Sequence, residues 1–192
     1  MDALLISTAL VAIAEIGDKT QLLSLILAAR YRQFWPIAWG ILLATLLNHA
    51  LAGWLGAWLA SLVEPDVLRW ALVVSLLAMA AWTLVPDKLD DDDAAKPRFG
   101  PFLTTTLAFF LAEMGDKTQI ATVLLAAEYQ PLSMVVLGTT LGMLIANLPV
   151  VALGARFADR LPLRYARWAA ATLFLLLAVA AAWPKPLAQL HP

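Results

Sequence analysis

Two short charged segments interrupt long apolar runs of this chain. Residues 15–21 read Glu-Ile-Gly-Asp-Lys-Thr-Gln, and residues 113–119 read Glu-Met-Gly-Asp-Lys-Thr-Gln. Each segment combines two carboxylates and an ammonium group with neutral oxygens. The neutral oxygens belong to Thr20, Gln21, Thr118 and Gln119. On a helix, Glu and Asp three apart share a face, and Glu and Lys four apart can pair. Gly17 and Gly115 could let two helices cross closely, or could equally permit a local helix break that frees backbone carbonyls as ligands. These residue types predict a polar site for a cation.

The charge inventory suggests what such a site exchanges. Together the segments hold four carboxylates and two ammonium groups, a formal charge of −2 when all are ionised. A low-dielectric site penalises uncompensated charge. One divalent cation or two protons would neutralise it, so we predict electroneutral exchange of one for the other. Hard oxygen ligands and the absence of cysteine favour Ca²⁺, Mn²⁺ or Mg²⁺ over zinc or copper. The thioether of Met114 either favours Mn²⁺ or simply packs against a neighbour.

A structural reading of the same segments is a set of buried ion pairs that holds two helices together. Ionisable residues at mid-membrane cost at least about 2.5–3.5 kcal/mol each and are functional by default. Helix pairing explains one Glu–Lys pair, but less well the additional carboxylates that recur at the same depth. We therefore expect the two segments to be functional.

Three further polar residues are expected at mid-membrane: Asn48, His49 and Asn147. They could add ligands, and His49 could relay protons. Hydrogen bonding between helices is the alternative for all three.

The elements that must position these residues are long apolar helices. Of 192 residues, 62% are hydrophobic and 14% charged, with a mean hydropathy of +0.79, whereas a soluble domain is about one quarter charged. Several apolar runs are as long as the about 20 residues that a helix needs to cross a bilayer. We predict an all-α membrane protein whose six transmembrane helices cover residues 3–29, 35–60, 68–86, 101–127, 131–155 and 165–184.

The helices form two related sets of three. A displacement of 98 positions maps the first charged segment onto the second, Gly40 onto Gly138, and residues 69–71 onto 167–169. A constant displacement over three helices indicates duplication. Because three is odd, the second set enters the membrane from the opposite side. The predicted architecture is two inverted three-helix repeats, 1–86 and 101–192, joined by an acidic cytoplasmic loop, 87–100, with the site between the repeats.

Loop charges predict the orientation. Two Lys or Arg residues, Arg69 and Lys185, lie on the side of the N-terminus. Nine lie on the other side: Arg30, Arg32, Lys88, Lys96, Arg98, Arg156, Arg160, Arg164 and Arg167. By the positive-inside rule, both termini are outside. The run of aspartates at 90–93 is then a solvated cytoplasmic loop or, alternatively, a metal sensor.

The doubled Glu-x-Gly-Asp-Lys-Thr segment resembles the signature of the GDT-one family of membrane proteins. This family includes Golgi manganese/calcium transporters of eukaryotes and bacterial manganese exporters. The resemblance covers essentially the full chain, including the repeat and the acidic loop. It implies cation/proton exchange with Glu15, Asp18, Glu113 and Asp116 as the metal ligands. The signature also covers Lys19, Thr20, Lys117 and Thr118.

The resulting expectation is a bacterial inner-membrane exporter of Mn²⁺, or of Ca²⁺, that works by alternating access and is driven by protons. The bacterial location is expected from the compact chain without a leader segment. Metal and protons are substrates, the bilayer is the surroundings, no cofactor is expected, and nucleic acid is not a partner. Alternatives are a Ca²⁺-selective exchanger, an exporter of another cationic solute, a passive channel, or a non-transporting structural subunit. An enzyme is not expected, because the sequence has neither cysteine nor a His-Glu-x-x-His motif.

Overall fold

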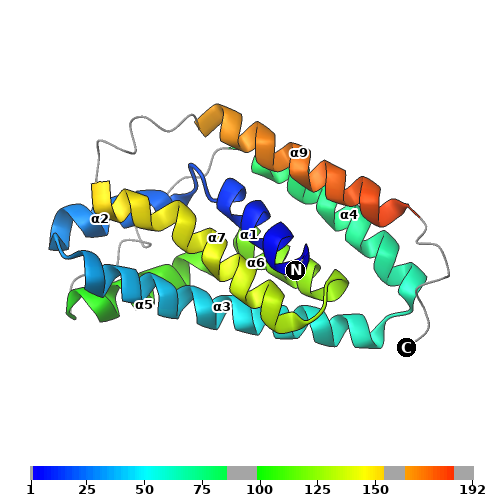
Figure 1. Ribbon diagram of the computed structural model, residues 1–192, viewed down its shortest axis with the longest axis horizontal. Coiled ribbons are helices and arrows are strands. Elements are labelled where there is room, and N and C mark those ends of the chain that lie inside the picture. Colours follow the sequence, from blue (N-terminus) through cyan, green and yellow to red (C-terminus); the bar gives the residue numbers. More distant parts are fainter. Residues whose placement is uncertain (1, 86–98, 154–162, 184–192) are drawn as a thin grey trace.

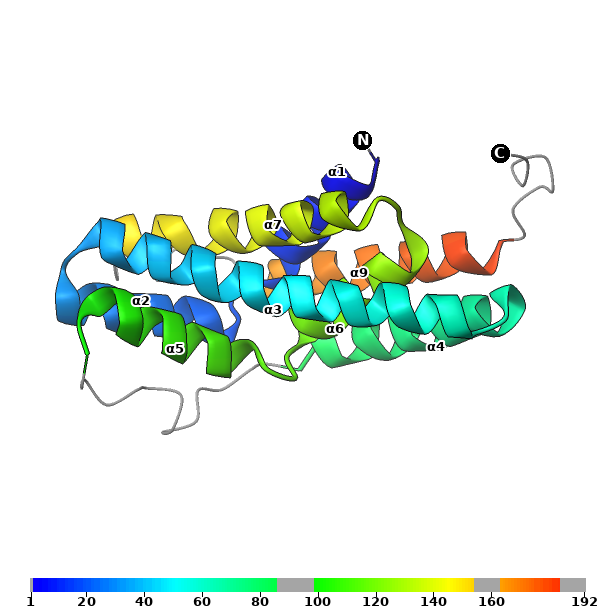
Figure 2. The ribbon, with the colours of Figure 1, turned by 90° about the horizontal axis from the view of Figure 1, so that it is seen from below.

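The computed structural model describes residues 2–85, 99–153 and 163–183, and across these ranges its regular elements are all α-helices. Figures 1 and 2 show them packed as an elongated bundle. In chain order they are α1 (Asp2–Ala14), α2 (Lys19–Tyr31), α3 (Phe34–Leu62), α4 (Pro65–Thr83), α5 (Pro101–Glu113), α6 (Lys117–Glu128), α7 (Leu132–Leu153) and α9 (Leu163–Ala182).

Three of these helices, α3, α4 and α7, are long and apolar enough to cross a membrane. Figures 1 and 2 show these three helices, and α9, running roughly along the long axis of the molecule. α1 and α5 have 13 residues each, which at 1.5 Å per residue span only about 20 Å of a hydrocarbon core about 30 Å thick. These two helices therefore need their continuations, α2 and α6, to cover the full thickness.

The helices predicted over 3–29 and 101–127 are both broken, a question that the sequence left open. Both helices stop at the charged segment and restart at its lysine. The breaks contain Gly17 at φ 82° and Gly115 at φ 75°. This left-handed conformation is cheap for glycine and unfavourable for other residues. Asp18 and Asp116 then cap α2 and α6 in extended conformation.

The breaks lie between two apolar clusters. One cluster joins α1, α4, α6 and α9 through residues such as Leu10, Leu125 and Phe174. The other joins α2, α3 and α5 through Ile41 and Phe109 among others. Each broken helix therefore has one part in each cluster, and this arrangement holds both charged segments at the junction.

The two halves repeat both their helices and their closest packing. A shift of 98 carries the first residues of α2, α3 and α4 onto those of α6, α7 and α9. A Cβ on Gly138 of α7 would lie 2.6 Å from the Leu4 carbonyl oxygen of α1. A Cβ on Gly40 of α3 would lie 2.9 Å from the Phe102 carbonyl oxygen of α5, the same position displaced by 98. α1 on α7 and α5 on α3 are thus equivalent close approaches.

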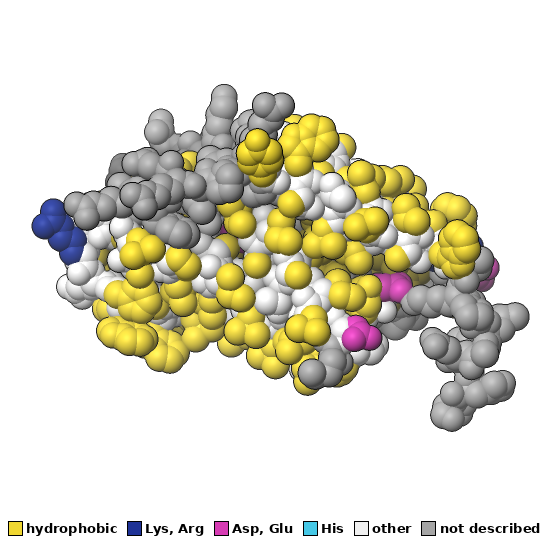
Figure 3. Space-filling view, turned by 45° about the horizontal axis from the view of Figure 1, so that its top comes forward, with side chains coloured by type: hydrophobic (Ala, Val, Ile, Leu, Met, Phe, Trp, Pro, Cys, Tyr) yellow, Lys and Arg dark blue, Asp and Glu magenta, His cyan; other side chains and the backbone are white. Residues whose placement is uncertain are grey.

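The exposed surface is that of a membrane protein. Large apolar side chains face outward on α3, α4, α7 and α9, among them Leu51, Val74, Ile145 and Leu176. Figure 3 shows one such face, covered mainly by hydrophobic side chains. The exposed Arg32 precedes α3, whereas the exposed Asp66 follows it. These charges therefore lie at opposite ends of a 29-residue helix.

Candidate functional site

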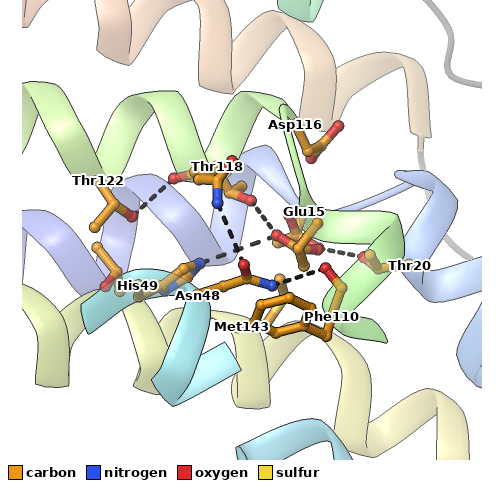
Figure 4. Close-up of polar contacts among 12 residues, drawn as sticks. Glu15, Thr20, Asn48, His49, Phe110, Asp116, Thr118, Thr122 and Met143 are labelled. Atoms are coloured by element: carbon orange, nitrogen blue, oxygen red, sulfur yellow. Dashed lines mark hydrogen bonds and ion pairs between the residues drawn. The ribbon is translucent and has the colours of Figure 1, made fainter. Parts of the chain in front are cut away.

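The structure brings carboxylates from both charged segments together. Ligand atoms of Glu15, Glu113 and Asp116 all lie within 4.8 Å of one another. The three side chains are buried, and so is Asp18. Figure 4 shows Glu15 and Asp116 beside the ends of the broken helices. The predicted meeting of the two segments is therefore present in the structure.

The lysines form ion pairs across the two halves. Lys19 Nζ lies 3.6 Å from Asp116 Oδ1, and Lys117 Nζ lies 3.5 Å from Asp18 Oδ1. The sequence predicted Glu–Lys pairs four apart within each helix. That spacing rule requires a continuous helix, and here each helix is broken between the glutamate and the lysine.

The threonines hold the glutamates in place. Thr20 and Thr118 each donate a hydroxyl hydrogen bond to Oε2 of the glutamate five residues earlier, Glu15 and Glu113. The other oxygen, Oε1, of both glutamates is buried and accepts no hydrogen bond from the described residues. A buried carboxylate oxygen without a donor is costly, so these two atoms are where a cation or a proton would be most stabilising.

The glutamines serve the helix breaks rather than adding oxygens to the site. Gln21 Oε1 accepts from the backbone N–H of Gly17 at 2.9 Å, and Gln119 Oε1 accepts from that of Gly115 at 2.7 Å. Both are the third residue of the new helix and reach back beyond its cap, as in a capping box. Gln21 Nε2 also donates to the Ala146 carbonyl oxygen at 2.9 Å.

Asn48 and Asn147 are hydrogen-bonded between helices. Asn48 Nδ2 donates to the Phe110 carbonyl oxygen at 3.0 Å, and its Oδ1 accepts from Gln119 at 3.3 Å. Asn147 Oδ1 accepts from Ser24 at 2.9 Å, and its Nδ2 lies 3.5 Å from Glu15 Oε2. Asn48 therefore links helices through hydrogen bonds, while Asn147 both links helices and reaches a glutamate.

His49 occupies the position equivalent to Asn147. Its Nε2 lies 4.0 Å from Glu113 Oε2, and the side chain is fully buried. Neither ring nitrogen has a hydrogen-bond partner among the described residues. The alternative of interhelical hydrogen bonding therefore has no support at His49.

Two site residues escaped the sequence reasoning: Ser24, which donates to Asn147, and Met143, whose sulfur lies 3.1 Å from Asn147 Nδ2. Ser24 lies three residues after Gln21, on the same helix face, and a shift of 98 maps it onto another hydroxyl residue, Thr122. This equivalence of Ser24 with Thr122 could have been read from the sequence.

The side chain of Met114 is 57% exposed. The aspartate run 90–93 lies outside the described residues.

Comparisons with known proteins identify the family of this chain. The family model for the divalent cation/proton antiporter GDT1 matches residues 3–91 and again 101–188. A Vibrio cholerae protein named "Putative manganese exporter" is 58% identical over 95% of this chain and 92% of its own length. GDT1-like protein sll0615 of Synechocystis is 29% identical over 92% of this chain and 94% of its own.

GDT1-like protein 5 of Arabidopsis thaliana is 28% identical over 90% of this chain and 92% of its own length. No solved structure matches the chain. The family match is double, and its two segments each contain one of the charged breaks. The chain belongs to the GDT1 (GDT-one) family of divalent cation/proton antiporters, which are transporters and not enzymes.

Proposed function

We propose that this protein exports Mn²⁺ from the bacterial cytoplasm across the inner membrane in exchange for protons. The family supports exchange of a divalent cation for protons, and the name of the Vibrio relative supports manganese and export. Metal and protons are both substrates in this proposal.

The observation that carries the proposal is the carboxylate group of Glu15, Glu113 and Asp116. Ligands that bind one ion at about 2.3–2.6 Å lie at most about 5 Å apart. The 4.8 Å spread of these oxygens meets that limit. One ion can therefore be held by side chains from both halves at once.

The ion pairs support the proposed stoichiometry. Pairing of Lys19 with Asp116 and of Lys117 with Asp18 leaves a formal −2, which corresponds to Glu15 and Glu113. Two buried carboxylates this close repel each other unless positive charge compensates them. One divalent cation or two protons would do so, and a site that must always hold one or the other couples the two flows.

Alternating access between two inverted repeats explains how such a site can transport. Six spans arise if α1–α2 and α5–α6 each cross as one broken helix, beside α3, α4, α7 and α9. The 98-residue equivalence of the helices and of the Gly40 and Gly138 contacts supports the repeat. Three spans per repeat would invert the second. Broken helices at a central site are typical of transporters built this way.

In the proposed cycle, a cytoplasmic metal ion displaces protons from Glu15 and Glu113. The repeats then rock about the site and open it outward, where protons rebind and the metal leaves. Asp116 binds the metal with the glutamates, and Asp18, which lies outside that close group, is the further ligand of the proposal. The two lysines hold both aspartates in place. The threonine hydroxyls fix the orientation of the glutamates throughout.

The test is Mn²⁺ uptake into inverted membrane vesicles with an imposed proton gradient. The native protein should take up Mn²⁺ only with the gradient, and Asp18→Asn should lose this uptake. Asp66→Asn makes the same chemical change at an 89% exposed side chain and should behave as native. Native uptake that ignores the gradient would indicate a channel. Gradient-driven uptake of Ca²⁺ alone would replace manganese with calcium.

Orientation can be tested because the chain has no cysteine. Single cysteines at Arg32 and Asp66 lie at opposite ends of α3. With both termini outside, an impermeant thiol reagent applied to intact cells should label Asp66→Cys and not Arg32→Cys. The reverse pattern would contradict the proposed orientation.

A further inference from the structure

We infer that His49 is a nitrogen ligand that selects transition-metal ions over Ca²⁺ and Mg²⁺. The inference rests on the proposed function, because it concerns the ion held by the carboxylate group. It places one donor atom of a different chemical kind beside Glu113, a member of that group.

The first observation is the unused imidazole. His49 is fully buried, and neither Nδ1 nor Nε2 has a hydrogen-bond partner in the described part of the chain. Burying a polar group without a partner is unfavourable. Figure 4 shows the His49 ring among the polar side chains of the site. A ligand that fills the site would satisfy the nitrogen that the protein leaves unbonded.

The second observation is the distance. Nε2 of His49 lies 4.0 Å from Glu113 Oε2, which is longer than a hydrogen bond of about 2.7–3.2 Å. It is within the about 5 Å that separates two ligands of one ion. The close carboxylate group does not include His49, so an ion bound by the imidazole sits on the Glu113 side of the site.

The third observation is the equivalent position in the other half. There Asn147 reaches Glu15 Oε2 with its amide nitrogen at 3.5 Å, while Ser24 and Met143 engage the rest of that amide. An amide nitrogen is only a hydrogen-bond donor. Neutral imidazole instead offers a lone pair to a metal. The two halves therefore present an amide to one glutamate and a potential metal ligand to the other.

The chemistry of the donor gives the selectivity. Ca²⁺ and Mg²⁺ are bound through oxygen, and a purely carboxylate site gives little basis for preferring Mn²⁺ over them. Imidazole nitrogen binds first-row transition metals and adds little for alkaline earth ions. One such ligand raises the preference for Mn²⁺ over Ca²⁺ and Mg²⁺. It does not favour Mn²⁺ over Fe²⁺ or Co²⁺, which generally bind the same donors more tightly.

The first experiment is competition in proton-driven vesicles, with Ca²⁺ as competitor of Mn²⁺ uptake. His49→Asn places in the first half the residue that the second half already carries. It should lower the preference for Mn²⁺ over Ca²⁺ at least about tenfold, equivalent to about 1.4 kcal/mol. An unchanged preference in a transporting variant would overturn the inference. Failure of the native protein to move Mn²⁺ would instead overturn the proposed function.

The second experiment does not depend on transport by the His49→Asn variant. The chain has only two histidines, His49 and His191. In the purified His191→Gln protein, ¹⁵N-labelled at histidine and loaded with Mn²⁺, pulsed electron paramagnetic resonance should detect one coupled histidine nitrogen. His49→Asn should lose that coupling, and His191→Gln should keep the native metal preference. Bound Mn²⁺ without any ¹⁵N coupling would overturn the inference.

Discussion

The two halves of the site share their backbone and differ in what meets each glutamate. Each half has a helix break at a glycine, a threonine that donates to the glutamate and a glutamine that accepts from the glycine amide. Glu15 then meets the amide of Asn147, which Ser24 and Met143 also engage. Glu113 meets His49, whose nitrogens have no hydrogen bond within the described ranges.

The two halves share the features that position the charged segments and differ in the residue that faces each glutamate. The break, its cap and the threonine bond are needed to hold a charged segment in a membrane, because every freed backbone group must find a partner there. The residue facing the glutamate from α3 or α7 is not part of that requirement. The two halves are therefore alike where they position the carboxylates and unlike where they meet a ligand.

The largest expected effect comes from neutralising either glutamate. Glu15→Gln and Glu113→Gln each keep the shape of the side chain and remove one charge from the proposed −2. Each should reduce proton-driven Mn²⁺ uptake at least about 100-fold, which corresponds to about 2.7 kcal/mol of lost ion stabilisation. The variants should remain folded in the membrane, checked by abundance and thermal unfolding. Near-native uptake by either variant would show that one half alone suffices.

The next largest effect is on the free energy of unfolding, and it differs between Lys117 and Lys19. Lys117 is 4% exposed and pairs with the buried Asp18, whereas Lys19, paired with Asp116, is 19% exposed. Removing one partner of a buried ion pair costs about 3–5 kcal/mol. Lys117→Met should therefore lower the free energy of unfolding in detergent by about this amount, and Lys19→Met by about half of it because water screens its pair.

A matched double variant tests the cause of that loss. Asp18→Asn together with Lys117→Met removes both charges and should recover much of the stability lost in Lys117→Met alone. No recovery would mean that the lysine stem, rather than the ion pair, stabilises the protein.

Much of this arrangement is readable from the sequence because it follows from the duplication. The 98-residue displacement predicted the equivalence of His49 with Asn147 and of Gly40 with Gly138. Hydropathy predicted an all-helical membrane protein. The charged segments were recognised as the place where the halves meet, and the structure brings them together.

The helix breaks and the ion pairs were harder to predict. Gly17 and Gly115 could either allow close helix packing or break the helix, and only their positive φ decides between the two. Once the helix is broken, the spacing of Glu15 and Lys19 no longer indicates an ion pair. Pairing across the halves depends on how α1–α2 packs against α5–α6. The local spacing of residues carries no information about that packing.

The equivalent close helix contacts at Gly40 and Gly138 should be destabilised equally by an added methyl group. Gly40→Ala and Gly138→Ala each place a Cβ within 3.0 Å of another helix, and overpacking of this kind costs about 1–3 kcal/mol. Both should lower the free energy of unfolding by similar amounts. A Cβ at Gly100 would meet no atom within 4 Å, so Gly100→Ala is the control and should lose less. A large difference between Gly40→Ala and Gly138→Ala would argue against equivalent packing.

The smallest expected effect separates the two glutamines. Gln21 accepts from Gly17 and donates a buried hydrogen bond of 2.9 Å to the Ala146 carbonyl oxygen. Gln119 accepts from Gly115 in an exposed bond and donates a longer, part-buried one of 3.3 Å to Asn48 Oδ1. A buried hydrogen-bond partner costs about 1–3 kcal/mol to remove, and an exposed one less. Gln21→Ala should therefore lower the free energy of unfolding by about 1–2 kcal/mol, and Gln119→Ala by about 0.5 kcal/mol.

Gln21→Glu distinguishes the two bonds of Gln21. It keeps the oxygen that accepts from Gly17 and replaces the donor with an oxygen facing the Ala146 carbonyl. If the contact with α7 is the more important, Gln21→Glu should be no more stable than Gln21→Ala in a thermal unfolding assay. If closing the helix break dominates, Gln21→Glu should be closer to native, and the same order should then hold for Gln119→Glu, because the break is the feature that both halves share.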